Sequence, residues 1–172
     1  MMHKLLALDP ATHVTGYAFF LGGELHQYGV ISSSLKGTWE DRCLRMVGGI
    51  NLVVERQGVL DVVVAEFPQF QSGSRGQAAS RGGDTLKLAC LCGLILARYP
   101  TIAEFVTPSE WKGQCPKLIT ASRCLKRYDV GASSLNDMNY TDAIMIGDYW
   151  LKEQHRLKRS SASTIKQEDI SV

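Results

Sequence analysis

At 172 residues, of which 45% are hydrophobic, the chain suits one domain with a full hydrophobic core. Its formal net charge of +2 excludes a strongly basic protein that coats nucleic acid through bulk electrostatics. No apolar run approaches the roughly 18 to 20 residues that span a bilayer, and the first residues lack the apolar segment of a secretory signal. We therefore expect a soluble, intracellular and cytoplasmic protein with no membrane partner.

The chain is expected to begin with three consecutive strands. The apolar run at residues 4 to 9 predicts a buried strand, which ends where Asp9 meets Pro10. Residues 16 to 21 and 24 to 31 flank two glycines, a pair typical of a tight hairpin turn.

The middle of the chain predicts alternating helices and strands. Thr38 and Asp41 resemble a capping box, which indicates a helix that continues to Gly58. Residues 59 to 65 predict a buried central strand, and the polar residues 71 to 83 predict an exposed loop. Asp84 is expected to cap a helix that runs to about Arg98. The resulting order favours a layered α/β domain.

The last third predicts a short strand at residues 102 to 106 and then two helices. Pro116 suits the first turn of one helix, and the other begins near Met138 and runs past Trp150. From 153 to 172 the chain is charged and serine-rich, with too little apolar surface to pack. We expect one domain over residues 1 to 152, followed by a partly disordered tail.

The five cysteines are odd in number and lie mostly inside apolar or helix-like segments, so we expect free thiols. Cys90 and Cys92 are two positions apart, which is not the spacing of a zinc hook.

Three acidic residues stand where apolar runs end or begin: Asp9, Glu66 and Asp142. Each alone has an ordinary explanation as a turn residue, a strand end or a helix ion pair. The element order, however, allows the first two to lie on adjacent strands while the third approaches from the last helix. Such a set could hold two divalent ions about 3.5 to 4 Å apart, as two-metal phosphodiester hydrolysis requires. Mg²⁺ fits carboxylate oxygens best, and we expect Mn²⁺ to substitute.

The segment from Leu6 to Tyr17, with Asp9-Pro10 followed by Val-Thr-Gly-Tyr, resembles the first-strand signature of the RuvC-like Holliday-junction resolvases, a family of the RNase H-like superfamily. Glu66 and Phe70 resemble the family's second acid and its loop aromatic, and Asp142-Ala143 resembles its final-helix motif. The resemblance covers roughly residues 4 to 150 and is weakest between 105 and 137.

This resemblance implies an α/β, RNase H-like fold: a central mixed five-stranded sheet, with three antiparallel strands and then parallel strands, flanked by helices. It implies a homodimeric, Mg²⁺-dependent endonuclease that nicks four-way DNA junctions during DNA recombination and repair. It also implies catalytic metal ligands at Asp9, Glu66 and Asp142. The family usually carries an acid or a histidine three residues before the last aspartate. Here that position is Asn139, a weaker neutral ligand, and Asp137 would replace it only if the helix began later.

Several residues are candidates for DNA contact. An exposed ring at Phe70 is expected to stack on an unpaired base, with Phe67 as the rival and packing beneath the loop as the alternative for both. Basic residues cluster in 75 to 87 and 112 to 127, and an ordinary solvated surface explains them comparably well. The basic candidates are Arg75, Arg81, Lys87, Lys112 and Lys117. His13 closely follows Asp9 and is expected to be an exposed loop histidine without function, with an approach to the scissile phosphate as the alternative.

Three alternatives compete with a junction resolvase. The first is a nuclease of the same fold that acts on other branched DNA or on RNA, and the second is a catalytically weak junction-binding protein. The third is an actin-like sugar kinase or ATPase, which the short chain and the lack of a second phosphate loop disfavour. The apolar faces of residues 86 to 96 indicate either a dimer contact or an enclosed core helix.

Overall fold

The structure is a computed structural model that describes residues 3–33, 36–69, 83–131 and 139–168. One sheet contains five strands in the order β3-β2-β1-β4-β5. The strands are β1 (Lys4–Asp9), β2 (Val14–Leu21), β3 (Glu24–Ser32), β4 (Val62–Glu66) and β5 (Ala103–Val106). The first three pair antiparallel, whereas β4 pairs parallel with both β1 and β5. This is the mixed five-stranded sheet that the sequence predicted.

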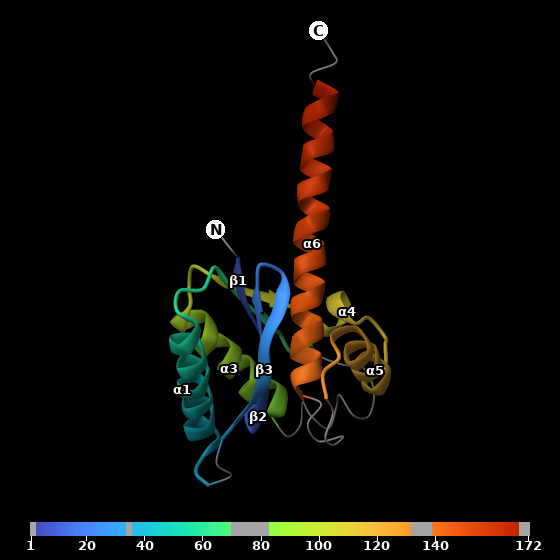
Figure 1. The fold of residues 1–172 in the computed structure, drawn as a ribbon. Coiled ribbons are helices and arrows are strands. Elements are labelled where there is room, and N and C mark those ends of the chain that lie inside the picture. Colours follow the sequence, from blue (N-terminus) through green and yellow to red (C-terminus); the bar gives the residue numbers. More distant parts are fainter. Residues whose placement is uncertain (1–2, 34–35, 70–82, 132–138, 169–172) are drawn as a thin grey trace.

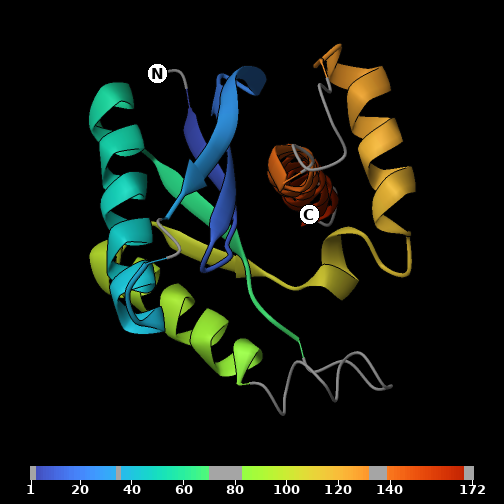
Figure 2. The ribbon, with the colours of Figure 1, turned by 90° about the horizontal axis from the view of Figure 1, so that it is seen from below.

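Helices cover both faces of the sheet, as Figures 1 and 2 show. They are α1 (Trp39–Gln57), α3 (Asp84–Arg98), α4 (Pro108–Trp111), α5 (Lys117–Tyr128) and α6 (Asn139–Glu168). Alternation along β1 divides the core, because Leu6 and Leu8 pack with α1 and α3 while Leu5 and Ala7 pack with α5 and α6. Each strand therefore contributes one row of side chains to each layer.

Most predicted elements are confirmed, and some details differ. The capping box between Thr38 and Asp41 is present at the start of α1. The strand expected from residue 59 begins only at Val62, and Val59 lies outside the core with an exposed fraction of 87%. Asp84 does not cap α3: Gly83 occupies the N-cap position at φ 69°, and Asp84 lies in the first turn. The sequence did not predict α4, although Thr107 and Glu110 form a capping box there.

Helix α6 is longer than the sequence predicted. It begins at Asn139 and continues to Glu168, so residues 153–168 are helical where a partly disordered tail was expected. Figure 1 shows the helix extending well beyond the sheet. No glycine or proline follows Gly147 before residue 168, and the pairs Lys152–Asp148 and Arg156–Glu153 stabilise successive turns. A domain boundary at residue 152 stays a prediction.

The described residues include no helix with the length and apolar character of a membrane span. All five cysteines fall in the described ranges and are free, as predicted. On α3, Leu86 is 69% exposed and Leu96 is 45% exposed, so an enclosed core helix does not explain these two side chains.

Candidate active site

The strand pairing brings Asp9 and Glu66 to one edge of the sheet. Strands β1 and β4 run parallel, with Leu8 opposite Ala65, and each acid is the next residue of its strand. Both acids also continue the alternate rows of side chains that pack against α5 and α6. The two carboxylates therefore occupy neighbouring positions on the face of the sheet that α6 covers.

A close approach between β2 and α6 places the third acid. Gly16 lies opposite Asp9 in the antiparallel register, and a Cβ atom at Gly16 would overlap the backbone of Asn139. Only a glycine lets the first residue of α6 approach the sheet this closely. Asp142 follows within the first turn of the helix and lies beside the ends of the strands.

The electrostatics of Asp9 indicate that the three acids share one site. Burial, followed by the nearby carboxylates of Asp142 and Glu66, raises the pKa of Asp9 to about 8. The ammonium groups of Lys117 and Lys112 act in the opposite direction. The carboxylates of Asp142 and Glu66 are therefore close enough to Asp9 to disfavour its charged form, in addition to the effect of burial.

Asp142 is buried and incompletely paired. Its exposed fraction is 4%, and its Oδ1 atom has no hydrogen-bond partner among the residues that the structure describes. Its Oδ2 atom lies 3.6 Å from Nζ of Lys117. Burial raises the pKa of Asp142, while Lys117 lowers it. The same ammonium lies 3.4 Å from Oδ1 of Asn139, so the predicted fourth ligand is next to the third.

Glu66 is held from the opposite side by α4 and the residue after it. The indole Nε1 of Trp111 donates a hydrogen bond of 2.6 Å to Oε2 of Glu66. Nζ of Lys112 lies 3.5 Å from the same oxygen and 4.5 Å from the centre of the indole ring. Trp111 was missed from sequence, although it directly precedes a residue that was selected and follows a recognisable capping box.

The chemistry of these side chains fits a divalent cation. Asp9, Glu66, Asp142 and Asn139, here called the acid site, offer the oxygen donors that Mg²⁺ and Mn²⁺ bind. A bound cation would give the unpaired Oδ1 of Asp142 a partner. It would also favour the charged form of Asp9, which burial and the neighbouring acids disfavour. Within the described ranges, no group of three or more histidine, cysteine or acidic side chains already has the geometry of a metal site. Lys112 and Lys117 instead contact two of the acids.

The other sequence candidates have different surroundings. Lys87 lies on α3, in the layer on the opposite face of the sheet, and pairs with Asp84 at 2.9 Å. Phe67 packs edge-to-face on Phe105, with ring centroids 5.6 Å apart. His13 is exposed in the connection between β1 and β2. Four candidates lie outside the described residues: Phe70, Arg75, Arg81 and Asp137.

Comparison with known proteins identifies a shared fold. No protein-family model matches the sequence, and no curated protein matches it. The structure is similar to Thermus thermophilus RuvC in complex with a Holliday junction substrate, at a TM-score of 0.62 and 14% identity, over 86% of this chain and 92% of that one. A second T. thermophilus RuvC structure gives a TM-score of 0.57 and 17% identity, over 85% and 92%.

A eukaryotic protein shares the same architecture. The yeast mitochondrial Holliday junction resolvase gives a TM-score of 0.61 at 9% identity, over 91% of this chain and 82% of that one. TM-scores of 0.57 to 0.62 show a common fold, and identities of only 9 to 17% show nothing beyond the fold. The RuvC-like fold implied by the sequence resemblance is therefore confirmed.

Proposed function

We propose that the protein is a Mg²⁺-dependent, structure-specific endonuclease that resolves four-way DNA junctions. The observation that supports this most strongly is the convergence of Asp9, Glu66 and Asp142, from two strands and a helix, on one electrostatically coupled site. The fold shared with two kinds of Holliday junction resolvase supports the same substrate class.

Each residue of the acid site has a distinct role in this proposal. Asp9 and Glu66 hold cations from the ends of adjacent strands, and the unpaired Oδ1 of Asp142 accepts one from the helix. Asn139 contributes a neutral amide oxygen. When bound, Mg²⁺ or Mn²⁺ supplies charge stabilisation to the attacking and leaving oxygens of the phosphodiester.

Lys112 and Lys117 have two tasks. Without metal, they partly neutralise Glu66 and Asp142. With metal bound, their ammonium groups are released from the carboxylates and contact phosphates of the DNA backbone. Loss of either lysine is expected to weaken junction binding similarly for all sequences and to reduce the salt slope by about one.

The assembly that we propose is a homodimer. Two opposed strands of a junction are cut symmetrically by two copies of one active site. Leu86 and Leu96 on α3 are exposed in the single chain and offer apolar surface for a second copy. We expect the protein to act inside the cell, where its DNA substrates are.

The decisive experiment is nicking of a synthetic four-way junction in Mg²⁺, with Mn²⁺ as a second metal. Wild-type protein is expected to cut opposed strands, and Asp9→Asn is expected to abolish cutting. Glu55→Gln, an exposed acid on α1, is the matched control and should cut normally. Binding without cutting by the wild type would favour a catalytically weak junction-binding protein instead.

A panel of substrates tests the nearest alternative. A replication fork, a flap and an RNA–DNA hybrid are compared with the junction at equal concentration. We expect the junction to be cut fastest. Faster cutting of any other substrate would support the nuclease activity but contradict the four-way junction as its substrate.

A further inference from the structure

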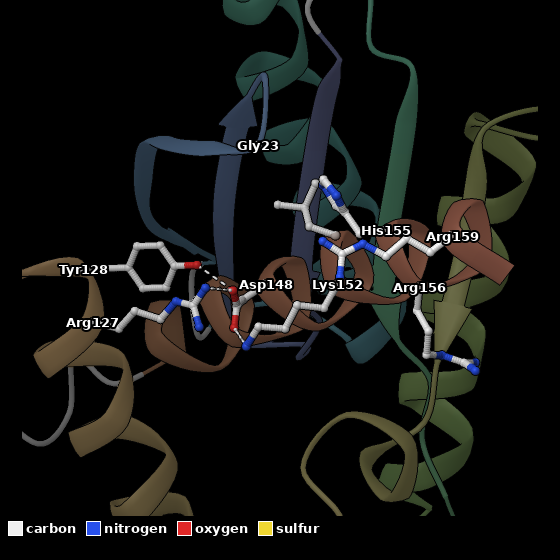
Figure 3. A pocket seen from close by; sticks show the side chains of 9 residues that line it. Gly23, Arg127, Tyr128, Asp148, Lys152, His155, Arg156 and Arg159 are labelled. Atoms are coloured by element: carbon white, nitrogen blue, oxygen red, sulfur yellow. Dashed lines mark hydrogen bonds and ion pairs between the residues drawn. The ribbon is translucent and has the colours of Figure 1, made fainter. Parts of the chain in front are cut away.

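A second polar feature lies away from the acid site. A cavity of about 480 Å³ lies between the β2–β3 turn at Gly23, the end of α5 and the middle of α6. Figure 3 shows the side chains that line it. Four cationic side chains and one carboxylate, that of Asp148, line it together with His155. We call this cavity the cationic pocket. Its cations are Arg127, Lys152, Arg156 and Arg159.

A buried aspartate holds two of these cations in place. Asp148 is 3% exposed, and its carboxylate accepts a hydrogen bond of 2.9 Å from the Tyr128 hydroxyl. The Arg127 guanidinium lies 2.9 Å away and the Lys152 ammonium 2.7 Å away. Two cations share one carboxylate, so this part of the pocket carries an excess positive charge. Arg127 comes from α5 and Lys152 from α6.

Two arginines on α6 extend the charge along the helix. Arg156 pairs with Glu153 at 2.8 Å, and Glu153 does not line the pocket. Arg159 lies almost one turn further on, and Figure 3 places both side chains on α6. Lys152 and Arg159 are separated by roughly 10 Å along the helix at about 1.5 Å per residue. This distance is longer than one phosphate group, so the cations could contact several successive phosphates of one chain.

Helices α5 and α6 connect the pocket to the acid site. Lys117 at the start of α5 meets Asp142, and Arg127 near its end meets Asp148. Along α6, Asp142 and Arg159 are separated by roughly 25 Å at about 1.5 Å per residue. A DNA arm leaving the acid site in this direction would reach the pocket after about seven base pairs at roughly 3.4 Å each.

We propose that the cationic pocket binds the sugar-phosphate backbone of a duplex arm of the DNA substrate, at a distance from the cleavage site. This inference rests on the proposed function. Guanidinium groups match phosphate geometry through paired hydrogen bonds, which suits arginine to this task. The contact adds affinity that depends on arm length and leaves the chemical step unchanged.

The test compares junction binding by two double variants, both in an Asp9→Asn background that prevents cutting. Arg156→Gln/Arg159→Gln removes the outer charges of the pocket, and Arg45→Gln/Arg56→Gln removes two exposed arginines from α1 on the other face of the sheet. Junctions with arms of about 5 and about 15 base pairs are titrated over a range of salt concentrations. The cutting rate at saturating junction is measured with the same substitutions and Asp9 intact.

For the pocket variant we expect several-fold weaker binding of the long-armed junction and a salt slope lower by about two. Short-armed binding, the saturated cutting rate and the α1 variant should be unchanged. Equal losses on both arm lengths, or an unchanged salt slope, would overturn the proposal and leave Asp148 as a structural clamp between α5 and α6.

The outcomes separate this inference from the function on which it rests. If the wild type cuts the junction and the pocket variant shows no arm-length effect, only the proposed role of the cationic pocket is contradicted. An arm-length effect without any cutting by the wild type supports the pocket and contradicts the nuclease. Failure of the wild type to bind DNA overturns both.

Discussion

Two aspartates on α6, Asp142 and Asp148, are buried to nearly the same extent and have opposite surroundings. The carboxylate of Asp148 has partners at 2.9, 2.9 and 2.7 Å from three side chains. The carboxylate of Asp142 has one lysine at 3.6 Å and, among the described residues, an oxygen without a hydrogen-bond partner. Burial alone therefore does not identify a metal ligand. A buried acid whose partners are too few to offset its desolvation is the better candidate.

The largest expected effect comes from replacing each of the two aspartates with asparagine. Asp142→Asn should reduce nicking by more than about 100-fold, because loss of a ligand exceeds the usual cost of losing its supporting contacts. Asp148→Asn should retain nicking and lower the free energy of unfolding by about 1 to 2 kcal/mol, since its cationic partners are half-exposed. Cutting assays and denaturant unfolding of both variants measure the contrast. Equal loss of nicking in the two variants would contradict it.

Two tryptophans, each of which donates a hydrogen bond to a glutamate, test the same contrast among residues that support the acids. Trp111→Phe keeps an aromatic ring but removes the donor to Glu66, and should reduce nicking by about 10-fold or more, with a higher Mg²⁺ requirement. Trp150 donates in the same way to Glu104, at 2.6 Å and away from the acid site. Trp150→Phe should lower stability by about 1 kcal/mol and leave the Mg²⁺ requirement unchanged. Similar metal titrations for both variants would remove Trp111 from the site.

The raised pKa of Asp9 predicts how the stability of the metal-free protein depends on pH. Because its pKa in the folded protein is about 8, above the usual value of 3.8, the folded state takes up a proton at this site at intermediate pH. This contribution to stability is complete below about pH 4, falls as the pH rises, and is lost above about pH 8. Asp9→Asn should therefore be inactive and yet more stable than wild type at pH 8, by at least about 1 kcal/mol or a few degrees in Tm.

Thermal unfolding in a metal chelator at several pH values measures this difference. Added Mg²⁺ should stabilise wild-type protein more than Asp9→Asn. A variant less stable than wild type at every pH would show that the charge of Asp9 is already well compensated.

The smallest effect concerns Asn139. Asn139→Asp supplies a charged oxygen and should lower the Mg²⁺ concentration for half-maximal nicking a few-fold, whereas Asn139→Ala should raise it. A Mg²⁺ titration of nicking measures both. An unchanged titration for the two variants would exclude Asn139 as a ligand.

Sequence reasoning located the acids because it used the strongest local rules. The period of two along β1 and β4 places Asp9 and Glu66 on one face once the parallel pairing is known. It missed Trp111, whose contact with Glu66 depends on α4, a single turn that hydrophobic periodicity does not detect.

Two further expectations depended on position along the chain and on composition. Lys87 was grouped with the basic candidates by sequence proximity, and its contact with DNA stays a prediction, on a helix that lies on the opposite face of the sheet from α6. The segment after residue 153 was expected to lack structure for want of apolar surface. The helix nevertheless continues to Glu168, and the paired charges of Arg156 and Glu153, which that expectation did not consider, stabilise the turn just after residue 153.

Because the backbone of Asn139 lies against Gly16, the hydrogen atom that serves as the side chain of Gly16 sets the spacing between β2 and α6 at the proposed metal centre. Gly16 is the register partner of Asp9, so any added carbon would separate the strand-borne acid from the side chains that α6 contributes to the acid site. Gly16→Ala is therefore a way to widen the centre without altering a single donor atom. A larger ion such as Ca²⁺, which prefers longer bonds to oxygen, would suit the widened centre better than Mg²⁺.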